Sequence, residues 1–178
     1  MPALTNAESA LLGLLCESPM HPYELEQQVK YRDMRFWTEL SMSSIYKLLR
    51  KLEKSGFVTH KNKISSQNRL RKQYSINAAG REALEKKLQS LLSEPEHIRW
   101  QVDIGIYNSD LLSSDKTRRA LQEYRISLKE KIKEYEVLLK FLKDSGCPAH
   151  RFGVATRPVY LLKGEIKWID SYLLELQK

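Results

Sequence analysis

Residues 41–58, SMSSIYKLLRKLEKSGFV, constrain the fold more than any other stretch of the sequence. A serine suited to an N-cap opens it and Gly56 stands where a helix ends in a left-handed residue, so it predicts a short helix followed by a strand. The apolar residues share one face of that helix: Met42, Ile45, Leu48, Leu49 and Leu52. The exposed residues form one line at spacings of 4, 3 and 4, flanked by Tyr46 and Lys51: Ser43, Lys47, Arg50 and Lys54.

The segments around this helix predict a fixed order of elements. Apolar periodicity indicates a helix over 4–16, and HPYELEQQVKYR opens a second helix with Pro22 at its first position. After the third helix, 57–64 and 70–76 read as two strands joined by a polar tip, and Asn77 can cap a fourth helix. Three helices, a hairpin and a helix are the order of a winged helix-turn-helix, whose third helix enters the major groove of DNA.

The positive charge of the chain is concentrated in this region. Residues 41–90 hold 12 Lys and Arg against 3 Asp and Glu, whereas the other 128 residues hold 18 against 19. Such a segregated charge favours a polyanionic partner, because basic side chains neutralise phosphates and release their counterions. A solvated basic face without a partner is the alternative.

Candidate DNA-binding residues follow from this placement. Serine hydroxyls at a helix start can hold phosphate, Lys47 or Arg50 can reach guanine edges, and a basic wing can follow the backbone. The predicted set is Ser41, Ser43, Ser44, Tyr46, Lys47, Arg50, Lys51, Lys54, Lys61, Lys63, Arg69, Arg71 and Lys72.

The C-terminal half predicts two long helices with heptad-like apolar seams. SEPEHIR is a break in composition, so we expect domains at 1–93 and 94–178. The pattern after residue 97 fits a strand and a helix equally well. The last helix carries two apolar stripes, which indicates self-association. The predicted dimer residues are Leu121, Tyr124, Leu128, Val159, Leu162, Ile166, Ile169 and Leu173.

Several functional classes are disfavoured by the sequence. Apolar runs are too short for a membrane span, no basic leader opens the chain, and the two cysteines lie far apart, so a reduced cytoplasmic protein is expected. Neither a catalytic motif nor a set of metal ligands stands out, and neither enzyme activity nor a cofactor is expected. A helical adaptor protein would explain the seams but not the basic segment, and a double-stranded RNA-binding protein would read shape with weak sequence preference.

The motifs LLGLL, HPYEL, FW, SIYKLLRKLEKSGFV and RKQYSINAAGREAL, in this order, resemble the PadR family of bacterial transcriptional regulators over roughly residues 4–90. The resemblance implies a mainly α fold: an N-terminal winged helix-turn-helix with a β-hairpin wing and a fourth helix, and an α-helical C-terminal dimerisation domain. It also implies a helix after residue 97. Pro22 stands where the family usually has Gly, and the tip SSQN lacks the Gly-rich turn of many members.

The combined prediction is a cytoplasmic, nucleoid-associated homodimer that binds an inverted-repeat operator and acts as a repressor. Its two reading helices would enter successive major grooves about 34 Å apart. A small aromatic or phenolic effector bound near the junction of the domains could tilt them out of register. The candidate effector residues, which at helical spacing also suit a core, are Trp37, Trp100, Tyr107, Arg157 and Trp168.

Overall fold

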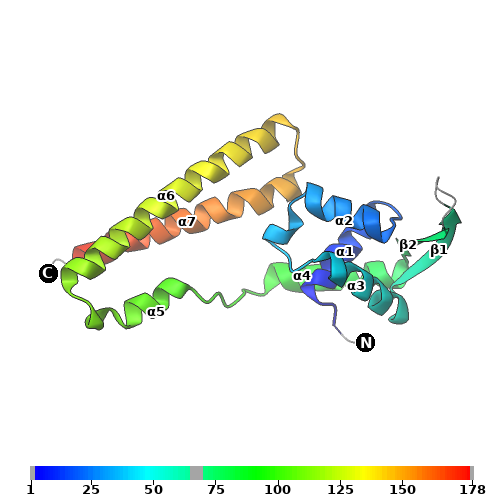
Figure 1. The fold of residues 1–178 in the computed structure, drawn as a ribbon, viewed down its shortest axis with the longest axis horizontal. Helices are drawn as coiled ribbons and strands as arrows, with labels where there is room; N and C mark the ends of the chain where they lie inside the picture. The colour runs from blue at the N-terminus through cyan, green and yellow to red at the C-terminus, as the bar shows by residue number, and fades with distance from the viewer. Residues whose placement is uncertain (1–2, 65–69, 177–178) are drawn as a thin grey trace. The chain divides into compact units, whose positions relative to one another are not determined.

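The computed structural model describes residues 3–64 and 70–176, and the side chain of Met42 also lies outside the described part. The chain forms two compact units, divided between His97 and Ile98 (Figure 1). This division falls within the segment SEPEHIR, where the composition changes. Each unit has its own hydrophobic cluster, so each is described separately.

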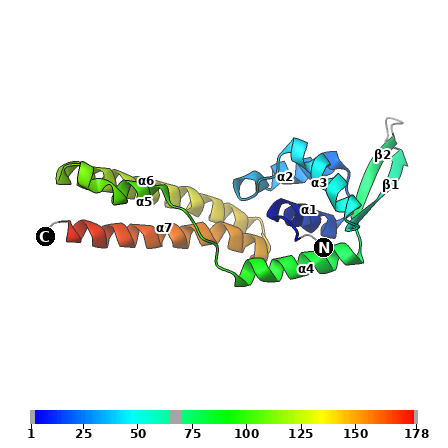
Figure 2. The ribbon, with the colours of Figure 1, turned by 90° about the horizontal axis from the view of Figure 1, so that it is seen from below.

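The first unit is a winged helix-turn-helix, which confirms the predicted fold class. Its elements, in order, are α1 (Asn6–Glu17), α2 (Pro22–Tyr31), the 3-10 helix η1 (Met34–Phe36), α3 (Met42–Lys54), β1 (Val58–Ile64), β2 (Leu70–Ile76) and α4 (Ala78–Ser93). Helix α1 lies between α4 and the α2–α3 pair (Figure 2). Its leucines therefore contact the other helices and form the centre of the core: Leu11, Leu12, Leu14 and Leu15.

Local side-chain bonds fix where these helices begin. Thr5 caps α1, because its Oγ1 accepts from the Glu8 amide at 3.2 Å while the Glu8 carboxylate accepts from the Thr5 amide at 2.8 Å. Asn77 caps α4 by accepting from the Gly80 amide at 2.9 Å. Gly56 ends the turn after α3 with a φ of 76°, as its left-handed role requires.

The connection before α3 carries three large apolar residues that differ in burial. The side chains of Phe36 and Trp37 are 70% and 51% exposed. The η1 turn directs Met34 inward instead, where it is 3% exposed. A short apolar cluster does not show by periodicity which of its members faces the core.

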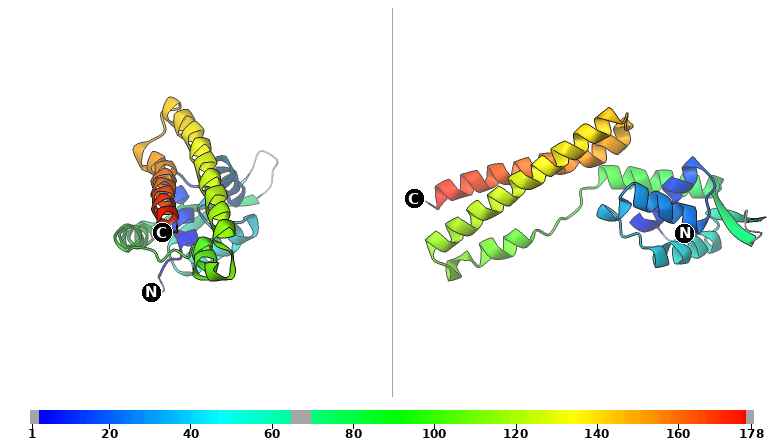
Figure 3. Two further views of the ribbon diagram at one scale, coloured as in Figure 1. Left: turned by 90° about the vertical axis from the view of Figure 1, so that its left-hand side faces the viewer. Right: turned by 45° about the horizontal axis from the view of Figure 1, so that its top comes forward.

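The regular elements of the second unit are all helices among its described residues. It contains α5 (Gln101–Tyr107), the 3-10 helix η2 (Ser109–Leu111), α6 (Ser114–Asp144) and α7 (Ala149–Glu175), and α6 and α7 run side by side (Figure 3). The helix expected after residue 97 is therefore confirmed. Among the described residues, none of the helices has both the length and the apolar composition that a membrane span requires.

Candidate nucleic-acid interface

Helix α3 presents a polar face opposite its buried one. Ile45, Leu49 and Leu52 are at most 1% exposed and hold the helix against the core. The residues on the opposite side are all exposed: Ser43, Tyr46, Lys47, Arg50 and Lys54. Because the apolar face is fully occupied by the core, the line of cations predicted from the spacing remains open to solvent.

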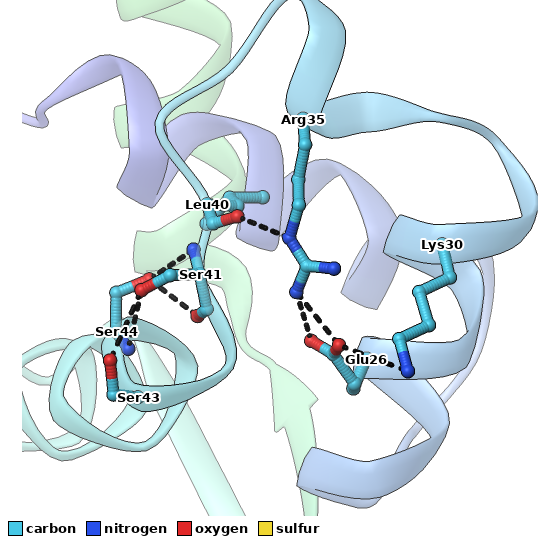
Figure 4. Close-up of polar contacts among 7 residues, drawn as sticks. All are labelled: Glu26, Lys30, Arg35, Leu40, Ser41, Ser43 and Ser44. Carbon is cyan, nitrogen blue, oxygen red and sulfur yellow. Dashed lines mark hydrogen bonds and ion pairs between the residues drawn. The ribbon is translucent and has the colours of Figure 1, made fainter.

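The serines at the start of α3 bond mainly to one another (Figure 4). The Ser41 amide donates to Ser44 Oγ at 2.8 Å, the Ser44 amide donates to Ser41 Oγ at 3.2 Å, and Ser44 Oγ donates to the Ser41 carbonyl at 2.7 Å. Ser43 Oγ lies 3.2 Å from Ser41 Oγ and faces outward. Ser41 and Ser44 were predicted to contact DNA, and the structure gives them a clear capping role. Of the three, Ser43 is the one placed on the outer line.

Lys51 differs from its neighbours because it has an acidic partner within the chain. Its Nζ lies 2.8 Å from the carboxylate of Glu8, whose side chain is 3% exposed. Burial raises the pKa of Glu8, but the bond from Lys51 and the bonds from Thr5 outweigh it, and the pKa is lowered from its ordinary value. Glu8 is therefore ionised near neutral pH, and it neutralises Lys51 before any polyanion approaches.

The wing carries its cations on both faces of the hairpin. Cross-strand partners point to the same side of an antiparallel pair, so Lys63 shares a face with Arg71, and Lys72 shares the opposite face with Asn62. Lys61, Lys63, Arg71 and Lys72 are all exposed. Arg69, also predicted to bind DNA, lies outside the described residues.

Backbone bonds attach the wing to the α1–α2 turn. Met20 and Tyr74 exchange two backbone hydrogen bonds of 3.0 and 2.9 Å, which form an isolated antiparallel bridge at the edge of the hairpin. Gln73 Nε2 donates to the Pro19 carbonyl at 3.1 Å, and His21 Nδ1 lies 2.9 Å from the Lys72 carbonyl. The wing is thereby held against the start of α2.

The wing and α3 are also linked directly. The ring of His60 on β1 contacts the Glu53 carboxylate at the end of α3 and packs against Tyr74, with ring centroids 5.7 Å apart. Glu53, the single acid of α3, is therefore held to the wing and away from the centre of the cationic line.

Two adjoining hollows open between α2, α3 and β2. They have volumes of about 460 and 320 Å³ and share Pro22, Tyr46 and Arg71. The larger one is also lined by His21 and Tyr23, and the smaller one by Leu49, Arg50, Lys72 and Tyr74. Aromatic rings and cations around an open depression suit the sugar and phosphate groups of a nucleic-acid strand. Sequence reasoning missed His21 and Tyr23, although Pro22 marked the helix start between them.

The candidate effector residues do not all belong to one unit. Trp37 lies in the first unit and the other four lie in the second. Trp168 stacks on Tyr172 with ring centroids 5.3 Å apart, and its side chain is 41% exposed. Trp100 is the N-cap residue of α5, while Tyr107 and Arg157 are exposed. The effector site therefore stays a prediction.

The predicted dimer residues make contacts within the chain. Four of them are buried in the second unit: Leu121, Leu128, Val159 and Ile169. The other four are half-buried against its cluster: Tyr124, Leu162, Ile166 and Leu173. The heptad seam thus has a partner within the same chain, α6 against α7. The second stripe of α7, which includes Leu161 and Trp168, remains exposed.

Taken together, a buried helical core, an outward cationic helix and an attached basic hairpin define a DNA-binding protein of the winged helix-turn-helix class. The family comparison gives the same result, since residues 11–86 match the family described as "Transcriptional regulator PadR-like family". Over these residues the chain is therefore similar to a family of transcriptional regulators.

Individual relatives extend the similarity to the full length. "Negative transcriptional regulator PadR" of Bacillus subtilis (strain 168) is 26% identical over 95% of this chain and 96% of its own length. The crystal structure of Bacillus subtilis PadR in complex with operator DNA has a TM-score of 0.77 at 22% identity, over 95% of this chain and 98% of that one. The same protein in complex with p-coumaric acid also has a TM-score of 0.77 at 22% identity, over 99% of both chains. The Vibrio cholerae virulence activator AphA has a TM-score of 0.66 at 18% identity, over 97% of this chain and 98% of that one.

Proposed function

We propose that this protein is a cytoplasmic, nucleoid-associated repressor that binds an inverted-repeat operator as a homodimer. The observation that carries the proposal is the outer face of α3, where Tyr46, Lys47 and Arg50 stand exposed beside a basic wing. The name of the Bacillus subtilis relative supports negative regulation, and its DNA complex supports an operator as the partner.

The test is binding of purified protein to the DNA upstream of its own gene, measured by fluorescence anisotropy. Lys47→Ala combined with Arg50→Ala should abolish preferential binding to this fragment, because the variant removes the two side chains best placed for base edges. Lys86→Ala combined with Lys87→Ala is the matched control, since it removes the same charge from α4. Binding of a duplex RNA with equal affinity, or a flat salt dependence, would contradict the proposal.

Dimerisation is proposed to use the exposed apolar surface of the second unit. Val137, Phe141 and Leu174 are 72%, 67% and 63% exposed there, and exposed apolar side chains that form a patch mark an interaction surface. Trp168→Glu should shift the protein from dimer to monomer in analytical ultracentrifugation. Ile169 does not serve this test, because it is fully buried in its own chain and a charge there would disrupt the α6–α7 pair. An unchanged dimer would place the interface elsewhere.

Release by a small aromatic effector is the last part of the proposal. It is supported by the complex of Bacillus subtilis PadR with p-coumaric acid and by exposed aromatic side chains such as Trp100 and Trp168 in the second unit. A titration of the protein–DNA complex with p-coumaric acid should lower the anisotropy. Binding that stays constant would exclude this acid as the effector and leave DNA binding unaffected.

A further inference from the structure

A buried carboxylate on α2 is connected through one arginine to the linker that enters α3. Glu26 on α2 is 2% exposed, and both of its oxygens accept hydrogen bonds of 2.7 Å from Nη2 of Arg35 in η1 (Figure 4). Lys30 is a second cation near the same carboxylate, at 3.8 Å. A buried charge with two cationic neighbours is compensated in the folded protein.

The same guanidinium has a second partner. Arg35 Nε donates to the carbonyl of Leu40 at 2.9 Å, and Leu40 is the residue immediately before the N-cap Ser41. One planar group therefore joins α2 to the last residue of the linker that enters α3. An ammonium group could approach Glu26 but has no fork with which to reach both partners in this geometry.

We propose that Arg35 is a positioning residue for DNA recognition: it sets where the N-terminus of α3 begins relative to α2. This inference rests on the proposed function. Hydrogen bonds to base edges tolerate displacements of only a few tenths of an ångström, whereas attraction to phosphates falls off slowly with distance. A misplaced α3 should therefore lose sequence preference and keep its salt-dependent binding to any duplex.

Arg35→Lys separates these two effects. It keeps a cation beside Glu26, so the fold should be retained, and it removes the bond to Leu40. The expected result is about a tenfold loss of affinity for the upstream fragment, the scale of one weakened base contact. Affinity for a scrambled duplex of equal composition should stay as in the wild type.

Arg32→Lys is the matched control. Arg32 also makes a paired contact with a carboxylate, since its two Nη atoms donate to Glu17 at 2.6 and 2.7 Å, and its Nε donates to Gln28. It joins α2 to α1 and has no bond to the linker before α3. Arg32→Lys should keep the full preference for the upstream fragment.

Both variants are compared by anisotropy on the two duplexes and by circular dichroism, each also in a Gly13→Ala background that offsets a loss of helix stability. Three results would overturn the positioning role while wild-type binding still supports the proposed function. Arg35→Lys could prefer the upstream fragment as strongly as the wild type does, or it could lose affinity equally for both duplexes. The control Arg32→Lys could also show the same loss of preference. A wild-type protein without preference for the upstream fragment would overturn both.

Discussion

Lys47 and Lys51 are separated by one turn of α3, and the structure predicts opposite outcomes when each is replaced by methionine. Both side chains are exposed cations in the sequence pattern, and both were predicted to contact DNA. Lys47 lies on the open line, whereas Lys51 is held by the buried carboxylate of Glu8 at 2.8 Å. Comparing the two variants therefore tests which lysine contacts DNA and which one stabilises the fold through an ion pair.

Lys47→Met should change the salt dependence of DNA binding, whereas Lys51→Met should change the stability of the fold. Loss of one phosphate contact lowers the slope of log affinity against log salt by about 0.9, and Lys47→Met should show this change with unaltered stability. Lys51→Met should leave the slope unchanged, because no counterion is released from a lysine that is already paired. It leaves Glu8 with the Thr5 amide as its hydrogen-bond donor, which should cost about 1–2 kcal/mol of unfolding free energy once the half-exposed position of Lys51 is considered.

Two assays are sufficient. Anisotropy of a labelled upstream duplex between about 50 and 200 mM salt gives the slope, and urea unfolding followed by circular dichroism gives the stability. Suppose that Lys51→Met reduced the slope as strongly as Lys47→Met and left the unfolding midpoint unchanged. The Glu8–Lys51 ion pair would then not exist in solution, and Lys51 would contact DNA as Lys47 does.

Further expectations concern stability. Gly80→Ala should destabilise the first unit by about 1–3 kcal/mol in urea unfolding, since its Cβ would lie 2.2 Å from the Phe57 carbonyl oxygen. Gly13→Ala meets no atom within 4 Å and should instead stabilise α1 by about 0.5–1 kcal/mol, and a loss there would contradict its open surroundings. In the second unit, burial and the charge of Asp103 raise the pKa of Glu165 above its ordinary value of 4.5. The proton-linked stability is complete below pH 4.5 and is lost as the pH rises through the raised pKa, so Glu165→Gln should increase the melting temperature at neutral pH and not at pH 4.

Elements with strong local signals were predictable from sequence. Ser41 and Gly56 bound α3 as expected, and the strands 57–64 and 70–76 differ from the observed ones by one residue. Caps, left-handed turns and alternation depend on near neighbours in the chain, so the sequence alone contains them. Helix α7 was harder, because Pro158 lies within it and its first turns show no clear apolar period.

Contacts between distant segments were not predictable in the same way. The pairing of Lys51 with Glu8 joins residues 43 positions apart, and the contact of His21 with the wing joins residues 51 positions apart. A cation on a helix surface carries no mark of whether an acid from another helix will face it. The seam of α6 and α7 has the same limit, since a heptad pattern does not specify whether its partner belongs to the same chain.

The backbone bonds between Met20 and Tyr74 have a consequence for the DNA. Because they fasten the hairpin to the helical core, the wing cannot bend toward the duplex without breaking two hydrogen bonds. If the wing keeps its position, most of the bending that brings protein and duplex into contact must occur in the DNA. We therefore expect operators with easily bent pyrimidine–purine steps to be favoured even at base pairs that no side chain touches.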